Sequence, residues 1–186
     1  MNLVRIAASV FAAAMTSAAA FAADAPPPVS TEPQNTSATY GDWTLRCSRT
    51  AQGDKEVRVC EVVLPFVAQA QGQSQTIGQL AIGHITTNTK DPLHVTFIVT
   101  PNVAFPSDVK LMSDDKDAQP VTLSWSSCTA QACRADGEFK DDLLKRWRAL
   151  TANGKLVFKA ATTEQPVPLP VSTRGLAQAL DALAKA

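Results

Sequence analysis

The stretch that most constrains the fold of this chain is YGDWTLRC, residues 40–47, an aromatic-rich segment that ends on a cysteine. Side chains alternate between the two faces of a β-strand, so Trp43, Leu45 and Cys47 would share one face. A second cysteine, Cys60, follows on a valine-rich run after a polar turn. The pattern predicts an opening β-hairpin that carries one cysteine on each strand and turns its apolar face to the core.

The four cysteines of the chain are an even number, which is typical of disulfide-bonded proteins in oxidising compartments. Three pairings are possible, and we expect the local one, Cys47 with Cys60 and Cys128 with Cys133, because each pair flanks a short turn. The alternatives are zinc and a redox site. Neither histidine is near a cysteine pair in sequence, and a thioredoxin-type motif has two residues between its cysteines, whereas Cys128 and Cys133 enclose four. Structural bridges are therefore favoured.

The beginning of the chain has the features of a secretory signal peptide over residues 1–22. These are a positively charged start, an apolar alanine-rich stretch and a small-x-small pattern that predicts cleavage before Ala23. A membrane anchor is the alternative, but an apolar length of about 17 residues is marginal for a bilayer core of about 30 Å. Residues 23–39 are rich in proline and polar side chains and predict a disordered tether. Residues 40–186 then form one folded domain.

Most of that domain shows the period of two that is typical of β-strands. The clearest case is residues 93–99, where Leu93, Val95, Phe97 and Val99 alternate with other residues. Similar but shorter patterns bring the expected number of strands to about eight. They are separated by turns rather than by long helical patterns, which favours antiparallel pairing.

Two segments change to a helical period. Residues 141–150 begin with acidic residues, continue with a stripe of leucines and a tryptophan, and end with basic residues, so they predict an internal helix that Asn153-Gly154 would terminate. Residues 175–186 predict a short C-terminal helix. The expected fold is therefore mainly β, an immunoglobulin-like antiparallel β-sandwich with one internal and one C-terminal short helix.

Charge and motifs argue against several functions. The 17 basic and 17 acidic residues are balanced, so the chain lacks the basic face typical of nucleic-acid-binding proteins. His84 and His94 are the only histidines, and no G-x-S-x-G or H-E-x-x-H motif accompanies them. Asp114, Asp115 and Asp117 lack the glycine and glutamate of an EF-hand loop, which favours a solvated turn over a calcium site. We expect no cofactor, no metal and no enzymatic activity; the alternative is an enzyme of unfamiliar type that uses His84 or His94.

The chain contains YGDW at 40–43, the two cysteine pairs, Trp125, DDLL at 141–144, VPLPVS at 167–172, Gly175 and ALDAL at 179–183. The order and spacing of these motifs resemble the invasion-associated locus B proteins, an exported family of alphaproteobacteria. The resemblance covers residues 40–183. Two turns that contain glycine in the family are Pro101-Asn102-Val103 and Ser107-Asp108-Val109 here, and Asn and Asp tolerate the left-handed conformation best among other residues.

This resemblance implies an exported β-sandwich protein without known catalytic residues, linked in pathogenic relatives to entry into host cells. We expect a non-enzymatic binding protein that is periplasmic, secreted or associated with the outer membrane, and whose partner is a cell-envelope or host protein. The polar turns at residues 48–55 and 113–119 are the expected recognition loops. Residues 165–172, with three prolines, are the expected edge strand. We expect no stable membrane insertion, and the sequence does not indicate an oligomeric state.

Overall fold

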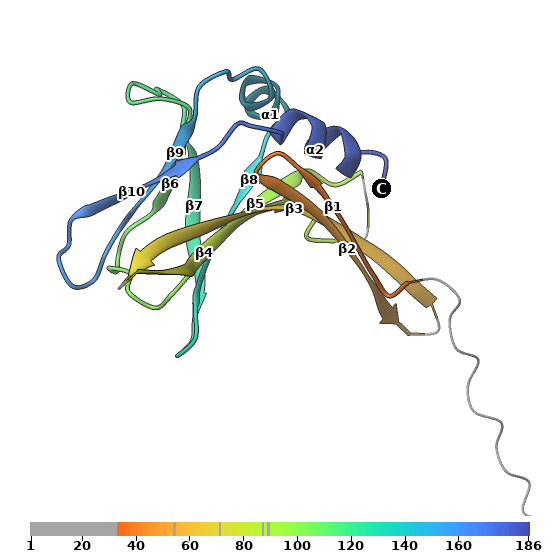
Figure 1. The fold of residues 1–186 in the computed structure, drawn as a ribbon, viewed down its shortest axis with the longest axis horizontal. Coiled ribbons are helices and arrows are strands. Elements are labelled where there is room, and N and C mark those ends of the chain that lie inside the picture. The colour runs from red at the N-terminus through yellow and green to blue at the C-terminus, as the bar shows by residue number, and fades with distance from the viewer. Residues whose placement is uncertain (1–32, 54, 71, 87, 89) are drawn as a thin grey trace, which may run out of the picture. The chain divides into compact units, whose positions relative to one another are not determined.

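The computed structural model describes residues 33–53, 55–70, 72–86, 88 and 90–186. Within them, ten strands pair antiparallel in the order β1-β2-β3-β4-β5-β8-β7-β6-β9-β10, and two short helices lie against them (Figure 1). The predicted mainly β fold with one internal and one C-terminal helix is confirmed. The elements are β1 Asn35–Tyr40, β2 Trp43–Gln52, β3 Lys55–Ala70, β4 Gln73–Gly83, β5 Leu93–Val99, β6 Val109–Met112, β7 Val121–Cys128, β8 Cys133–Phe139, α1 Asp141–Arg148, β9 Gly154–Lys159, β10 Pro166–Val171 and α2 Leu176–Leu183.

Strand β7 joins the two layers of the fold, because its two halves pair with different strands. Its first half pairs with β6, where Leu123 lies opposite Val109, and its second half pairs with β8. One layer therefore holds β1 to β5 and β8, and the other holds β6, β9 and β10. Side chains of both layers meet in the core, where the ring centroids of Phe97 in β5 and Phe158 in β9 are 5.5 Å apart.

The alternation of β5 produces the centre of this core. Val95, Phe97 and Val99 are buried, while the residues between them are only partly covered. The inward face of β2 is also as predicted, because Trp43, Leu45 and Cys47 are all buried. Burying one large apolar side chain contributes about 1.5–3 kcal/mol, so these two strands contribute a large share of the hydrophobic stabilisation.

Helix α1 covers most of the predicted internal helix and ends at Arg148. Its acidic first turn and basic last turn complement the helix dipole, and Trp147 is its buried residue. The predicted glycine cap is wrong, however. Gly154 is the first residue of β9, and a Cβ atom there would lie 2.4 Å from the Trp147 ring, so glycine is needed at this position for close packing rather than for ending the helix.

Helix α2 follows Gly175, whose φ of 85° lies in the left-handed region. Its apolar side packs against β1, β2 and β3 through residues that are all buried. The C-terminal helix is therefore part of the core. The residues are Leu176, Ala179, Leu180 and Leu183.

One predicted boundary needs correction. The predicted tether at residues 23–39 overlaps β1, which pairs with β2 from Asn35 opposite Ser48 to Tyr40 opposite Trp43. Its first five side chains are exposed, so this strand is held by backbone hydrogen bonds and has no apolar periodicity to reveal it. Strands β3 and β4 remain paired as far as Ala70 opposite Gln73. The predicted signal peptide and most of the tether lie outside the described residues.

Strand β10 is an edge strand, as its prolines predicted. It pairs with β9 alone. Its exposed positions are the three prolines Pro166, Pro168 and Pro170, and they alternate with the half-buried Val167 and the buried Leu169 and Val171. Backbone N–H groups alternate in direction along a strand, so the three prolines remove donors from the free edge and leave those that face β9. No helix in the described part of the chain is long and apolar enough to cross a membrane.

Candidate functional site

The first disulfide closes the base of a long hairpin arm. Cys47 of β2 and Cys60 of β3 lie directly opposite each other and form the predicted bridge. Beyond it, residues 48–59, which we call the β2–β3 arm, extend away from the core, and no side chain that the structure describes there is buried (Figure 1). The predicted loop at 48–55 is thus mostly strand. The bridge and the backbone ladder, rather than apolar packing, hold this arm in place.

The second predicted bridge, between Cys128 and Cys133, closes the β7–β8 hairpin. Cys128 is exposed and Cys133 is buried. The Thr129 N–H donates to the carbonyl oxygen of Ala132 at 2.9 Å, which completes a tight turn inside the bridge. The bridge therefore has a structural role and connects the ends of the two strands.

The YGDW segment is clamped to the end of β10. The indole Nε1 of the fully buried Trp43 donates a hydrogen bond to the carbonyl oxygen of Ser172 at 2.8 Å. The Ser172 hydroxyl donates to the Asp42 carboxylate at 2.6 Å, and the Arg174 guanidinium forms an ion pair with the same carboxylate. A Cβ atom on Gly175 would lie 2.0 Å from the Tyr40 carbonyl oxygen. The clamp therefore requires these particular residues at both ends of the domain.

This clamp also sets the charge state of Asp42. Hydrogen bonds from Arg174, and then from Ser172, lower the pKa of the Asp42 carboxyl from 3.8 to about 2, although partial burial opposes the shift. The clamp is thus fully formed at neutral pH. It has a structural role, since both charged groups are engaged with each other.

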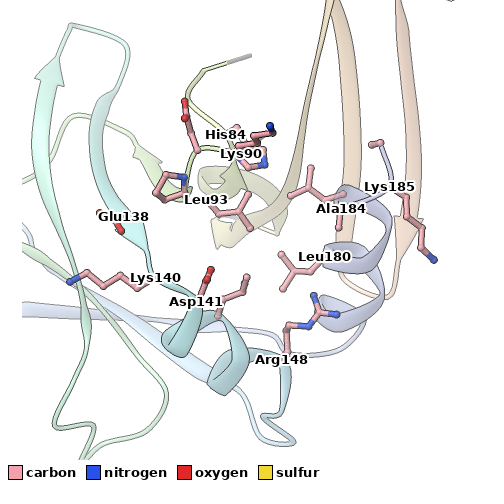
Figure 2. Close-up of a pocket in the computed structure, with 15 residues that line it drawn as sticks. His84, Lys90, Leu93, Glu138, Lys140, Asp141, Arg148, Leu180, Ala184 and Lys185 are labelled. Carbon is pink, nitrogen blue, oxygen red and sulfur yellow. The ribbon is translucent and has the colours of Figure 1, made fainter. Parts of the chain in front are cut away.

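A cavity of about 730 Å³ lies where the β4–β5 connection, the beginning of α1 and the end of α2 meet (Figure 2). This is within the size range of small-molecule sites. Leu93 and the buried Leu180 line it, and the Asp141 carboxylate points into it from the first residue of α1 (Figure 2). His84 lines this cavity and also a smaller one beside Arg58.

The two histidines occupy different environments. His84 is half-buried, and its Nδ1 atom is buried without a hydrogen-bond partner among the described residues. The cavity that it lines also contains the carboxylates of Asp91, Glu138 and Asp141. His94 is in β5, opposite Glu138 of β8, on the face that does not point into the core.

This sequence and fold are similar to those of known proteins. The model of the family described as invasion associated locus B (IalB) protein matches residues 43–184. The chain belongs to the IalB family. The crystal structure of invasion associated protein B from Bartonella henselae is similar to it, with a TM-score of 0.63 and 21% sequence identity over 81% of this chain and 95% of that one. None of the curated proteins matches the chain.

The family match helps to interpret the clamp. The resemblance expected from the motifs is confirmed, and two of those motifs, YGDW near the beginning and the segment from Val167 to Gly175 near the end, are in direct contact. The two disulfides and membership of the IalB family together indicate that this domain functions outside the cytoplasm.

The acidic loop at residues 113–119 differs from the prediction for this IalB-family domain. The predicted solvated turn is tied to the core, because the side chain of Asp117 is fully buried and pairs with Arg146 of α1. Asp115 forms an ion pair with Lys155 of β9, and only Asp114 of the three aspartates remains on the surface without an ion pair in the described structure. The loop is therefore a poor candidate for a recognition loop.

Burial alone would raise the pKa of the Asp117 carboxyl. The pKa nevertheless lies below its usual value, because hydrogen bonds and a nearby charge stabilise the carboxylate. The hydrogen bonds come from the backbone of Ser113 and Gln119 and from the Ser113 hydroxyl, and the charge is that of Arg146. Sequence reasoning missed this site because an Asp-rich turn is normally solvated. The cavity was missed as well, since its walls come from three segments that are far apart in the chain.

Proposed function

We propose that this IalB-family protein is a non-enzymatic binding protein of the cell envelope that contacts another protein through the β2–β3 arm. The observation that carries the proposal is that the arm projects from the core and is held at its base by a disulfide. Its described side chains are exposed or half-buried on both faces, and the Cys47–Cys60 bridge closes its base. An exposed, preorganised hairpin loses little conformational entropy when a partner binds.

The charge of the arm also suits protein recognition. The arm carries charged residues of both signs. Arg49 is paired with Arg58 across the two strands, and a guanidinium nitrogen of Arg49 lies 3.7 Å from a carboxylate oxygen of Glu56. Charges of both signs on an exposed arm favour a partner surface that carries a matching polar pattern. They disfavour a purely apolar partner.

The absence of an oriented base supports a non-enzymatic role. A catalytic histidine is normally held by a hydrogen bond from its second ring nitrogen to a third group. Among the described residues none bonds to Nδ1 of His84. An enzyme that uses His84 or His94 would instead lose its activity when the histidine concerned is replaced, and would keep it when the arm is shortened.

The test uses two matched deletions. In the first variant residues 50–57 are replaced by Asn-Gly, which connects the paired residues Arg49 and Arg58 through a type I′ turn. In the control, residues 68–75 are replaced by Asn-Gly between the paired residues Val67 and Thr76, which shortens the β3–β4 hairpin equally. Both variants retain the core and both disulfides.

Each tagged protein is then cross-linked in cell-envelope extract and in host-cell extract. We expect the same partner with the parent protein and with the control, and its loss in the arm-shortened variant, while all three unfold at similar temperatures. The extract that supplies the partner distinguishes an envelope role from host interaction. A partner retained by the arm-shortened variant would overturn the proposal.

We further propose that the protein is exported with removal of residues 1–22 and acts in the periplasm or at the cell surface. The proposal rests on the signal-like leader and the two bridges. Intact-mass measurement of protein recovered from periplasmic and culture fractions should give a chain that begins at Ala23. A membrane-bound chain that retains Met1 would contradict it.

A further inference from the structure

The cavity between the β4–β5 connection, α1 and α2 has an apolar floor. It is lined by leucines from three separate elements, Leu93 of β5, Leu144 of α1, and Leu180 and Leu183 of α2. Leu180 and Leu183 are buried, whereas Leu93 and Leu144 are only partly buried, so Leu93 and Leu144 supply most of the apolar surface that a ligand would contact. Apolar side chains that line a concave space of this size are typical of a ligand site, and they would bury an apolar group of the ligand.

One wall of the cavity carries the carboxylates of Glu138 and Asp141 together with Lys140, whose ammonium points away from Asp141 in Figure 2. Glu138 at the end of β8 and Asp141 at the start of α1 both line it, and neither forms an ion pair with any residue that the structure describes. The third carboxylate, Asp91, is already engaged, because Thr86 and Asn88 donate hydrogen bonds to it. Glu138 and Asp141 are thus available to a cationic group, and Figure 2 shows the Asp141 carboxylate directed into the space.

The opposite side of the cavity supplies hydrogen-bond donors and positive charge. His84 and Lys90 both line the cavity there, away from Asp141 in Figure 2. Nδ1 of His84 is one of four buried side-chain nitrogen atoms that have no hydrogen-bond partner in the described structure. Arg148, which also lines the cavity, is neutralised by Asp181. An anionic group would find its partners at His84 and Lys90.

We propose that this cavity binds a short peptide with free termini and an apolar side chain. The peptide ammonium contacts Asp141 and Glu138, its carboxylate contacts His84 and Lys90, and its side chain lies on the leucine floor. This arrangement matches a zwitterion because charges of opposite sign face each other across an apolar surface. No residue of the β2–β3 arm lines this cavity, so the proposal does not depend on the proposed function.

The probe is the dipeptide Leu-Leu, compared with N-acetyl-Leu-Leu, which lacks the ammonium, and with Leu-Leu amide, which lacks the carboxylate. Titration by calorimetry and by amide chemical shifts should show saturable binding of Leu-Leu. Shifts should be concentrated at residues that line the cavity. Each blocked peptide should bind about tenfold more weakly, which corresponds to the loss of about 1.4 kcal/mol of favourable interaction.

Variants test separately the proposed ammonium contact at Asp141 and the proposed carboxylate contact at His84. Asp141→Asn should weaken Leu-Leu about tenfold and leave N-acetyl-Leu-Leu unchanged, while His84→Phe should weaken Leu-Leu and leave the amide unchanged. Asp108→Asn, at an exposed carboxylate outside the cavity, is the matched control. Thermal unfolding confirms that each variant is folded. The proposal is overturned if the three peptides bind equally or if Leu-Leu does not saturate at millimolar concentration. It is also overturned if Asp141→Asn weakens the binding of Leu-Leu and of N-acetyl-Leu-Leu alike, or if decanoate binds more tightly than Leu-Leu.

Discussion

Arg146 of α1 donates two hydrogen bonds to the Asp117 carboxylate, at 2.9 and 3.0 Å, and so ties the helix to the loop between β6 and β7. The Asp117 side chain is 0% exposed, whereas a third of the Arg146 side chain remains accessible. A third bond runs from Arg146 to the carbonyl oxygen of Gln119 at 2.7 Å. A charged pair therefore fixes a segment that its composition alone would place in solvent.

We expect Asp117→Ala to lower the free energy of unfolding by about 3–5 kcal/mol, because it leaves the Arg146 charge without its partner. The matched control is Asp114→Ala in the same loop, since Asp114 is exposed and accepts one backbone hydrogen bond, from Lys116. That change should cost about 0.5 kcal/mol or less. Urea denaturation measures both. Equal losses in the two variants would show that the buried pair is not what stabilises this loop.

The clamp at Asp42 predicts acid sensitivity. The pKa of this carboxyl is lowered from 3.8 to about 2 in the folded protein, so its contribution to stability is complete above about pH 4 and is lost as the pH falls toward 2. Asp42→Asn should therefore reduce stability at pH 7 and flatten the decline between pH 4 and pH 2. Denaturant unfolding at several pH values measures this. A variant whose stability declines as steeply as the parent's in that interval contradicts the prediction.

The two disulfides should differ in their effect. In the chain-entropy model the Cys47–Cys60 bridge, with a sequence separation of 13, stabilises by about 3 kcal/mol, and the Cys128–Cys133 bridge, with a separation of 5, by about 2 kcal/mol. Paired Cys→Ser replacements, one pair at a time, should show this order in urea unfolding. Non-reducing peptide mapping provides the control for pairing, and a link between Cys47 and Cys133 would be incompatible with the structure.

Gly175 should be far less tolerant than Gly53, although both have positive φ values, 85° and 64°. A Cβ atom on Gly175 would lie 2.0 Å from the Tyr40 carbonyl oxygen, whereas one on Gly53 would meet nothing within 4 Å. Gly53→Ala should cost about 1 kcal/mol of conformational strain. Gly175→Ala should cost about 3 kcal/mol because overpacking adds to that strain. Thermal and urea unfolding decide the comparison, and similar costs would argue against a close contact at the clamp.

The sequence predicted those elements whose side chains divide clearly between core and solvent. The alternation of Val95, Phe97 and Val99 predicted β5, and the change of period at Asp141 predicted α1. The local disulfides followed from the position of each cysteine pair around a turn. In all of these cases neighbouring residues carry the signal, so no knowledge of distant contacts is needed.

The features that were missed depend on distant contacts. Strand β1 has exposed polar side chains and is held by its ladder with β2, so it has no apolar pattern. Strand β3 continues through Pro65. The pairing of β3 with β2 ends at Val63, opposite Thr44, so at Pro65 the strand pairs with β4 alone and proline is tolerated. The burial of Asp117 depends on Arg146, 29 residues further along the chain.

The clamp has a consequence for the order in which the molecule is completed. Trp43 is among the first residues of the domain to be synthesised, but the carbonyl oxygen that satisfies its indole belongs to Ser172, 129 residues later. Such a long-range contact forms only when nearly the whole polypeptide is available, whereas the Cys47–Cys60 hairpin can close early. While the chain is incomplete, the contact between its two ends therefore stays open, and it closes only when the last segment is available.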